Sequence, residues 1–277
     1  MLTKSELVQL WKKNDFRPKR RLGQNFLIDK NIKNKIIEFI NPDVNDKILE
    51  IGAGFGEITI DLSERAKKVI AIEKDKKILA ILKKEVLKNT RNISLVEGDV
   101  LKIDIAEHFN KVVGNLPYYI STAIIEKLFD IKDKKDVEIF IMLQKEYVDR
   151  ITAKPGGKEY SSISLYVQMH VDVKKLMNIK RTCFYPIPDV DSSFIKLVKR
   201  DISVNVKNKE FLNKIIRSAF QQRRKKIINA LSFGGFLADK GALENRLKNV
   251  INENARPEDL SLEDYCKIAN ALWEKKE

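Results

Sequence analysis

The tetrapeptide Asn115-Leu116-Pro117-Tyr118 carries residue types that could do chemistry on the exocyclic amine of an adenine. Such an amine is a poor nucleophile because its lone pair is delocalised into the ring. Two acceptors aimed at its hydrogens, the Asn115 side-chain oxygen and the Leu116 carbonyl, would expose that lone pair. Pro117 fixes φ and helps hold the carbonyl, and Tyr118 would stack on a base that has left its own stack. An ordinary strand-ending turn with Tyr118 in the core is the alternative.

A glycine loop, Glu50–Gly56, follows a β-branched run and opens a helix. Glycines at such a junction let the backbone approach a ligand closely and turn sharply. The spacing is GxGxG rather than the GxGxxG of dinucleotide sites, which argues against NAD. Glu73, 21 residues beyond Gly52, ends the next strand, where an acid can accept both ribose hydroxyls. Together they predict a nucleoside ligand, although a glycine turn made only for packing remains open.

Further polar groups end the next two strands of the same pattern. The third strand ends in Glu97-Gly98-Asp99, and the fourth leads into Asn115. Doubly wound sheets bind their ligands at the carboxyl edge of the strands. Four successive strands that deliver polar groups to that edge therefore indicate one site.

The elements that must position these residues alternate along the chain, which predicts an α/β fold with a parallel sheet. Strands are expected at Ile48–Ile51, Val69–Ile72, Ile93–Val96, Lys111–Gly114, Glu138–Leu143 and Phe194–Val198. Helices are expected at Lys30–Ile40, Ile58–Ala66, Lys76–Lys88, Ser121–Ile131 and Ser162–Val171. At the start of the chain, Thr3 and Glu6 form a capping box for a short amphipathic helix.

The end of the chain contains only helical patterns. They cover Lys209–Leu231, Ala242–Val250 and Leu262–Glu274, the last capped by Ser261. We therefore expect two domains: residues 1–203, an N-terminal extension with a Rossmann-like catalytic domain, and residues 204–277, a small all-α domain.

Composition limits the function. The chain has 277 residues and 53 Lys+Arg against 39 Asp+Glu, a formal net charge of +14, with 43% hydrophobic residues. A folded, strongly basic protein favours a polyphosphate partner such as RNA or DNA, although lysine-rich usage also follows from a hot habitat or an AT-rich genome. With two Cys, two His and no CxxC, we expect no metal site and a reducing cytoplasm. No apolar run is long enough for a membrane span, and no signal core is present.

On these motifs the sequence resembles the small-subunit rRNA adenine dimethyltransferases of the KsgA type, class I methyltransferases that use S-adenosylmethionine. The resemblance runs from about Lys19 to the C-terminus. It rests on the glycine loop, Glu73, Gly98-Asp99 and several further blocks: Leu22–Leu27, Asn115–Thr122, Met142–Glu146, Phe184–Pro188, Val190–Ser192 and Ala219–Lys225.

The resemblance implies roles for particular residues. The cofactor S-adenosyl-L-methionine would be held by Gln24, Asn25, Leu27, Gly52, Gly54, Glu73, Asp99, Val100 and Asn115. The catalytic set would be Asn115, Leu116, Pro117, Tyr118 and Phe184, with Phe184 as the second aromatic that sandwiches the target base. The family transfers two methyl groups to each of two adjacent adenosines in a hairpin loop near the 3′ end of small-subunit rRNA. The implied partner is therefore this rRNA or an immature small subunit. Nothing in the sequence indicates an obligate dimer, so we expect a monomer.

Some alternatives stay open. Tyr119 replaces the Asn of many bacterial members, which favours an archaeal or eukaryotic-like branch. The erythromycin-resistance enzymes share the glycine loop and the same type of tetrapeptide but modify large-subunit rRNA, and DNA adenine methyltransferases are related chemically. A ribosome-assembly or transcription factor that acts mainly by binding is the alternative outside enzymes.

Basic residues cluster in two places, and either cluster could be only a solvated face. The candidate RNA-binding residues are Arg20, Arg21, Arg217, Arg223, Arg224 and Lys225. In the expected helix Lys209–Leu231, Arg223 falls on the apolar stripe, so its guanidinium must either snorkel to solvent or meet a charged group. A carboxylate across the domain junction and an RNA phosphate are equally good partners for it at this point.

Overall fold

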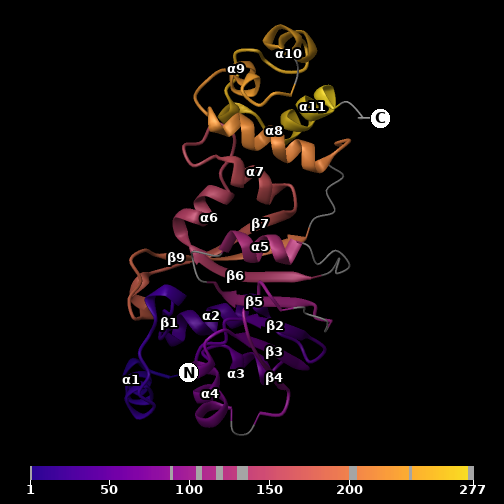
Figure 1. Cartoon of the computed structure of the whole chain (residues 1–277). Helices are drawn as coiled ribbons and strands as arrows, with labels where there is room; N and C mark the ends of the chain where they lie inside the picture. Colours follow the sequence, from indigo (N-terminus) through magenta and orange to yellow (C-terminus); the bar gives the residue numbers. More distant parts are fainter. Residues whose placement is uncertain are drawn as a thin grey trace. The chain divides into compact units, whose positions relative to one another are not determined.

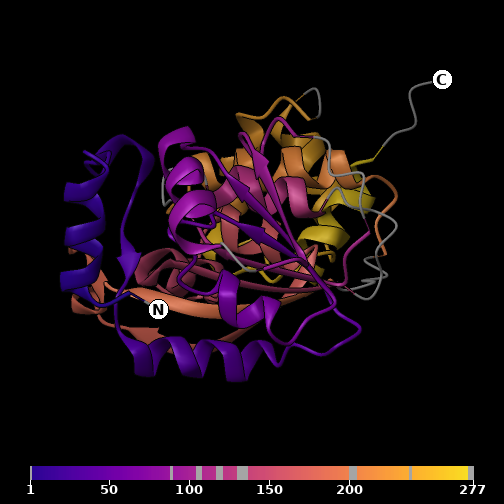
Figure 2. The same ribbon diagram turned by 90° about the horizontal axis from the view of Figure 1, so that it is seen from below.

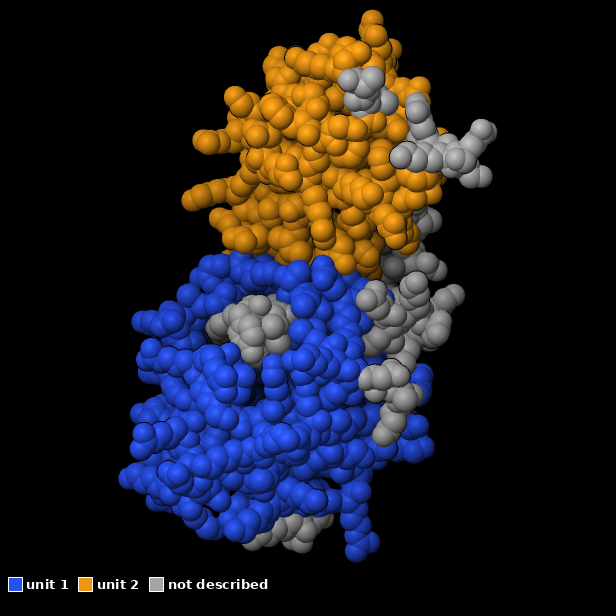
Figure 3. All heavy atoms as spheres, in the orientation of Figure 1, with its two compact units in different colours: residues 1–148, 174–199 blue, residues 149–173, 200–277 orange. Residues whose placement is uncertain are grey.

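A computed structural model describes residues 2–87, 90–103, 108–116, 121–129, 137–199, 205–236 and 239–273 (Figure 1). Two compact units are present, one of residues 1–148 and 174–199 and the other of residues 149–173 and 200–277 (Figure 3). The second unit thus takes residues 149–173 in addition to the C-terminal part, whereas the sequence pattern suggested one division near residue 203. The pattern could not place that stretch because its helix packs within the second unit, as described below.

The class I methyltransferase fold expected from the sequence is confirmed by a seven-stranded sheet in the order β4-β3-β2-β5-β6-β9-β7. The strands are β2 (Lys47–Ile51), β3 (Lys68–Glu73), β4 (Ile93–Glu97), β5 (Lys111–Asn115), β6 (Glu138–Gln144), β7 (Val171–Ile179) and β9 (Ser192–Lys199). Strands β4, β3, β2, β5 and β6 run parallel, and β9 pairs antiparallel with β6. All six strands expected from the sequence are present within one or two residues.

Both faces of the central strands are buried, since Ile48 and Leu49 point to opposite faces and each is 0% exposed. The helices of this region are α1 (Lys4–Lys13), α2 (Lys30–Ile40), α3 (Thr59–Ser63), α4 (Lys76–Ile81), which continues as a π-helical turn over Leu82–Val86, α5 (Ser121–Phe129) and α6 (Lys145–Ile151). Apolar residues of α2 share a core with β2, β3 and β5. Figure 2 shows the indigo helices α1 and α2 at the outside of this unit. The central strands are therefore held by packing on both faces.

The second unit has a helical core of its own. It contains α7 (Ser162–Gln168), α8 (Lys209–Gln221), α9 (Ile227–Ser232), α10 (Lys240–Leu247) and α11 (Leu262–Leu272), together with a 3-10 turn at Pro257–Asp259. Tyr160 and Tyr265, both 0% exposed, are at its centre, and their hydroxyls donate to the carbonyls of Leu260 and Pro257. The helical C-terminal region expected from the sequence is present. No helix of the described ranges is long and apolar enough to cross a membrane.

Two expected helices differ from the structure, and two short strands were not expected. The helix predicted at Ser162–Val171 ends at Gln168, and Val171 begins β7, an edge strand whose lysines hide its pattern. The helix predicted at Lys209–Leu231 is broken after Gln221, because the Ile227 amide donates to the Ala255 carbonyl instead of continuing the helix. The two-residue strands β1 (Phe26–Leu27) and β8 (Phe184–Tyr185), which pair antiparallel, are too short to be seen in a sequence pattern.

Candidate active site

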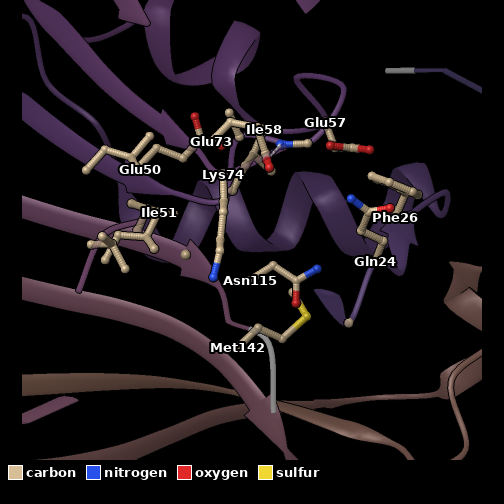
Figure 4. A pocket seen from close by; sticks show the side chains of 18 of the residues that line it. Gln24, Phe26, Glu50, Ile51, Glu57, Ile58, Glu73, Lys74, Asn115 and Met142 are labelled. Carbon is tan, nitrogen blue, oxygen red and sulfur yellow. Dashed lines mark hydrogen bonds between the residues drawn. The ribbon is translucent and has the colours of Figure 1, made fainter. Parts of the chain in front are cut away.

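The carboxyl edge of the sheet forms a pocket where polar groups of four strands meet (Figure 4). The glycine loop closes onto β3, because the amides of Gly52 and Ala53 both donate to the Ile72 carbonyl, at 2.8 and 3.2 Å. A Cβ on Gly52 would lie 3.5 Å from the Asn115 carbonyl oxygen. The loop after β2 therefore approaches the end of β5, as the sequence pattern suggested.

Gly54 has a φ of +55°, in the left-handed region, which favours glycine. A Cβ there would also lie 2.6 Å from Glu57 Oε2, the end of a flexible side chain that would have to shift. The backbone conformation is therefore the main reason for glycine at this position.

Glu73 ends β3 and faces the pocket while 9% exposed. Its Oε2 accepts from the Gly54 amide at 3.1 Å and its Oε1 from the Asp75 amide at 2.8 Å. Burial raises the pKa of Glu73 above its usual value, against the effect of these backbone donors. Two amides hold the carboxylate in one orientation, which suits an acceptor for ribose hydroxyls.

Asp99 and Val100 line the same pocket from the end of β4. Asp99 Oδ2 accepts from the Lys74 amine at 2.8 Å, and Oδ1 accepts from the Leu101 amide at 3.1 Å. The hydrogen bond from Lys74 chiefly lowers the pKa of Asp99. Asp99 is therefore an ionised acceptor, whereas Val100, 6% exposed, supplies an apolar wall.

Asn115 lines the pocket at the end of β5, and its amide nitrogen donates to the Asn25 carbonyl at 3.2 Å. Because the nitrogen is held in this way, the side-chain oxygen is the end available as an acceptor for a substrate amine. Leu116 is 1% exposed, and its amide donates to the Met142 carbonyl at 3.2 Å. Pro117 and Tyr118 lie outside the described residues, as does Tyr119.

The segment Gln24–Leu27 also lines the pocket. Gln24 is held at both ends of its amide, which accepts from the Lys19 amide at 2.7 Å and donates to Asp75 at 2.9 Å. Its role is thus to fasten the segment. In the short β1–β8 pair, Leu27 is opposite Phe184.

Phe184 is 1% exposed and belongs to the core cluster that contains Leu27 and Phe194. A ring packed on all sides cannot stack on a substrate base without leaving that packing. In this structure Phe184 supports the strand that carries Leu27.

The sequence motifs missed several residues of the site. Asp75, 3% exposed, accepts from both Lys19 and Gln24 and caps α4, so it connects the Gln24 segment to Glu73. Asp75 could have been noticed in the sequence, because it is a carboxylate two residues beyond Glu73 at the start of an expected helix. Glu57, one residue beyond the glycine loop, also lines the pocket, and nothing in its spacing marks it.

The N-terminal helix supports the glycine loop, which the sequence pattern did not reveal. Trp11 of α1 packs in one aromatic cluster with Phe16, Phe26 and the loop residue Phe55. The ring centroids of Phe26 and Phe55 are 4.9 Å apart, and those of Trp11 and Tyr185 are 5.4 Å apart. The predicted amphipathic face of α1 is confirmed, but its partner could be identified only in three dimensions.

Of the basic candidates, Arg20, Arg21, Arg217, Arg224 and Lys225 are exposed. Arg223 lies in the connection between α8 and α9 rather than within a helix. Its Nε is 2.6 Å from Glu258 Oε2, and its Nη2 donates to the carbonyls of Gly157 and Lys158 at 3.1 and 2.7 Å. Of the two partners considered for Arg223, the structure shows a carboxylate, Glu258, which belongs to the same unit.

The acidic side chains that line the pocket fit a cationic nucleoside cofactor. Glu73 and Asp99 are held by hydrogen bonds, whereas Glu50 and Glu57 keep buried carboxyl oxygens without a hydrogen-bond partner in the described part of the chain. No group of three or more His, Cys, Asp or Glu suited to a metal is found in the described ranges.

Comparisons with known proteins find relatives over nearly the whole chain. Residues 15–274 match the family model described as ribosomal RNA adenine dimethylase. The chain is similar to the protein of Bacillus cereus named ribosomal RNA small subunit methyltransferase A, with 41% identity over 98% of this chain and 96% of that protein. A Bacillus anthracis protein of the same name is also 41% identical, with the same coverage.

Among solved structures, the chain is similar to a dimethyladenosine transferase from Plasmodium falciparum, with a TM-score of 0.76 and 27% identity over 88% of this chain and 95% of that one. The 23S rRNA methyltransferase ErmE has a TM-score of 0.68 at 23% identity, over 90% of this chain and 99% of that one, and so shares the fold. The branch suggested by Tyr119 is not tested by these likenesses and stays a prediction.

Proposed function

The chain belongs to the ribosomal RNA adenine dimethylase family, and from this premise we propose how the pocket at its carboxyl edge acts on small-subunit rRNA. The protein is an S-adenosylmethionine-dependent adenine dimethyltransferase of that rRNA. Its targets are two adjacent adenosines in a hairpin loop near the 3′ end, each converted to dimethyladenosine. The placement of Asn115 beside the glycine loop is the observation that carries the assignment of the site.

The cofactor supplies an electrophilic methyl group when bound. Glu73, fixed by two backbone amides, would accept from its ribose, and Asp99 from its adenine amine. Gly52 and Gly54 would leave room for its methionine portion. The residues Gln24, Asn25, Leu27 and Val100 would close the pocket around it.

Asn115 acts on the target amine. Its oxygen and the Leu116 carbonyl would accept from the N–H groups of the amine, which would turn the nitrogen lone pair towards the methyl carbon of a bound cofactor. After each transfer the methylated amine would lose one proton to solvent. A hydrogen bond that strengthens as the amine becomes tetrahedral favours the transition state over the ground state. No histidine is among the described residues that line the pocket, so the activation proposed here rests on acceptors rather than on a general base. Pro117 and Tyr118 remain predictions for holding the carbonyl and stacking the flipped base.

The rRNA backbone would be held by exposed basic residues. We assign phosphate contacts to Arg20 and Arg21 in the first unit and to Arg217, Arg224 and Lys225 in the second. Such contacts set affinity and register, whereas the choice of adenosine comes from the hairpin shape and the flipped base. The partner would be an immature small subunit in the cytoplasm, bound by a monomer without a metal ion.

The test is methyl transfer from labelled S-adenosylmethionine to undermethylated small subunits, with large subunits and DNA in parallel, followed by nucleoside analysis. We expect dimethyladenosine in the small-subunit rRNA alone. Label in large subunits or DNA would refute the substrate assignment, and no label despite cofactor binding would favour an assembly factor.

Asn115→Ala tests the site itself. Loss of one acceptor that acts on the reacting amine should reduce methyl transfer by about 10²–10³-fold, with RNA binding changed by less than about threefold. Filter binding and single-turnover transfer on the same preparation separate the two. Equal losses in both measurements would contradict the role assigned to Asn115.

A further inference from the structure

Three glutamates of the cofactor pocket are placed around the glycine loop: Glu50 on β2, Glu57 after the loop and Glu73 on β3. Glu73 has two amide donors, but the other two are poorly satisfied. Glu57 Oε2 accepts from the Phe55 amide at 3.1 Å, while its buried Oε1 has no partner in the described part of the chain. Glu50 is 1% exposed, and neither of its oxygens is hydrogen-bonded there.

Desolvated carboxylate oxygens without partners cost folding free energy unless a ligand satisfies them. The described lining residues contain one cation, Lys74, and its amine is already 2.8 Å from Asp99. The pocket therefore lacks positive charge on the side where the glutamates gather. A ligand that brings a positive charge would meet an acceptor held ready for it.

Glu57 is the better placed of the two unsatisfied residues. Figure 4 shows its carboxylate on the side of the pocket formed by Gln24 and Phe26. Its Oε2 also lies 2.6 Å from the position of a Cβ on Gly54, so it borders the part of the loop left open by glycine. Glu50 lies deeper, with only 1% of its surface exposed.

We propose that Glu57 is a cofactor-specificity residue whose unpartnered carboxylate oxygen binds the positively charged amino group at the methionine end of the cofactor. The inference rests on the proposed site, since it takes the methionine portion to lie along the glycine loop. It adds an acidic contact that the motifs of the family resemblance do not contain.

Glu57 should lose a proton when it binds the amino group of the cofactor. Burial chiefly raises the pKa of Glu57 to about 8, and the carboxylate of Glu73 adds to the rise. The charged groups that share the pocket with it are Glu50, Glu73, Lys74 and Asp99. At pH 7 the empty site thus holds a proton on Glu57, which an ammonium ligand displaces. Binding of the cofactor at pH 6–7.5 should release close to one proton and tighten as the pH rises, up to about tenfold per unit.

The experiment is calorimetric binding to the whole protein, in buffers of different ionisation enthalpy, with S-adenosylmethionine, S-adenosylhomocysteine and adenosine. Glu57→Gln removes the charge and keeps the shape. At pH 7.5 it should weaken both amino-acid-bearing ligands by about tenfold to a hundredfold, as for one charged hydrogen bond. It should also abolish the proton release and leave the affinity for adenosine, which lacks the amino group, within twofold.

Glu73→Gln is the matched control, because it changes the ribose end instead and should weaken adenosine as well. If Glu73→Gln leaves adenosine binding unchanged, the site assignment itself is wrong. If Glu73→Gln weakens adenosine but Glu57→Gln leaves the affinity and proton release for S-adenosylmethionine intact, only the role of Glu57 is refuted. Loss of the proton release in Glu50→Gln rather than Glu57→Gln would likewise overturn it. Melting curves of each variant identify a folding defect.

Discussion

At the amino ends of β2 and β5, the buried Lys111 amine lies 2.7 Å from Asp46, whereas at the carboxyl end of β2 Glu50 is buried with neither oxygen bonded to the described residues. Asp46 also accepts from Asn110 at 2.5 Å, and Lys111 donates to the Asn41 carbonyl at 2.8 Å. The amino ends of β2 and β5 thus carry a hydrogen-bonded ion pair, whereas the carboxyl end of β2 carries a buried carboxyl group without a hydrogen-bond partner in the described part of the chain.

The pKa values move in opposite directions at the two ends. Burial alone would raise the pKa of Asp46, but hydrogen bonds from Lys111, the Asp43 backbone and Asn110 together lower it. Burial chiefly raises the pKa of Glu50 to about 8, with a smaller contribution from the carboxylates of Glu57 and Glu73 and against the effect of the nearby Thr59 hydroxyl. The buried charges at the amino edge are therefore paired within the fold, whereas at the carboxyl edge buried carboxyl groups are left without partners among the described residues, available to a ligand at a cost in stability.

The largest effect is expected at the amino edge. Lys111→Met would leave the Asp46 carboxylate buried without its cation, and breaking such a pair costs about 3 kcal/mol. The loss should be full at pH 7 and shrink as the pH falls through the acid range, because a protonated Asp46 needs no cation. Chemical denaturation at pH 7 and pH 4 measures both values.

Lys35→Met, at an exposed position of α2, is the matched control and should change stability by less than about 0.5 kcal/mol. The cofactor affinity of folded Lys111→Met should stay unchanged, since Lys111 is not among the described residues that line the pocket and Asn115 lies about 13 Å along the strand from it. A variant that binds the cofactor weakly but unfolds like the wild type would contradict the separation of the two ends.

Glu50→Gln should increase the free energy of unfolding at neutral pH, whereas Lys111→Met should decrease it. In the wild type Glu50 keeps its proton until about pH 8, whereas the unfolded chain ionises near pH 4.5. Stability therefore falls as the pH rises from about 4.5 to 8. Gln does not titrate, so the variant should gain stability relative to the wild type as the pH rises from about 4.5 towards 8, and this gain should be absent near pH 4.

Melting temperature against pH measures this difference, and the exposed Glu38→Gln on α2 should show no such dependence. A Glu50→Gln protein that is less stable at pH 7.5 would mean that an ionised Glu50 is stabilised in the native pocket. The contrast between the two edges would then be lost.

The two edges also explain what the sequence could predict. The strands, Gly52, Glu73, Asp99 and Asn115 follow local rules, because each is at a strand end and parallel strands bring their ends together. Gly54 was likewise predicted, although its close approach to the Glu57 carboxylate depends on packing.

Other features depend on distant partners. Asp75 is defined by Lys19 and Gln24, some fifty residues earlier in the chain, and the role of Phe55 by the aromatic cluster of α1. The break after Gln221 follows from a hydrogen bond between Ile227 and Ala255, which no helical pattern contains. Tertiary contacts decided these points against local propensity.

The smallest change in stability is expected in the connection between α8 and α9, where one arginine is paired and its neighbour is exposed. Arg223 has a carboxylate and two carbonyls as partners, so Arg223→Ala should cost about 1 kcal/mol of stability, since the group is one-third exposed. Arg224 next to it is exposed, and Arg224→Ala should leave stability unchanged. If Arg224 contacts one phosphate, its loss should reduce the slope of log K against log salt by about 0.7 for single-stranded RNA. Denaturation and salt-dependent RNA binding on both variants distinguish the two roles.

A change of slope in Arg223→Ala without loss of stability would mean that Arg223 leaves Glu258 to bind RNA. Pairing in the free protein would then not separate structural from RNA-binding arginines.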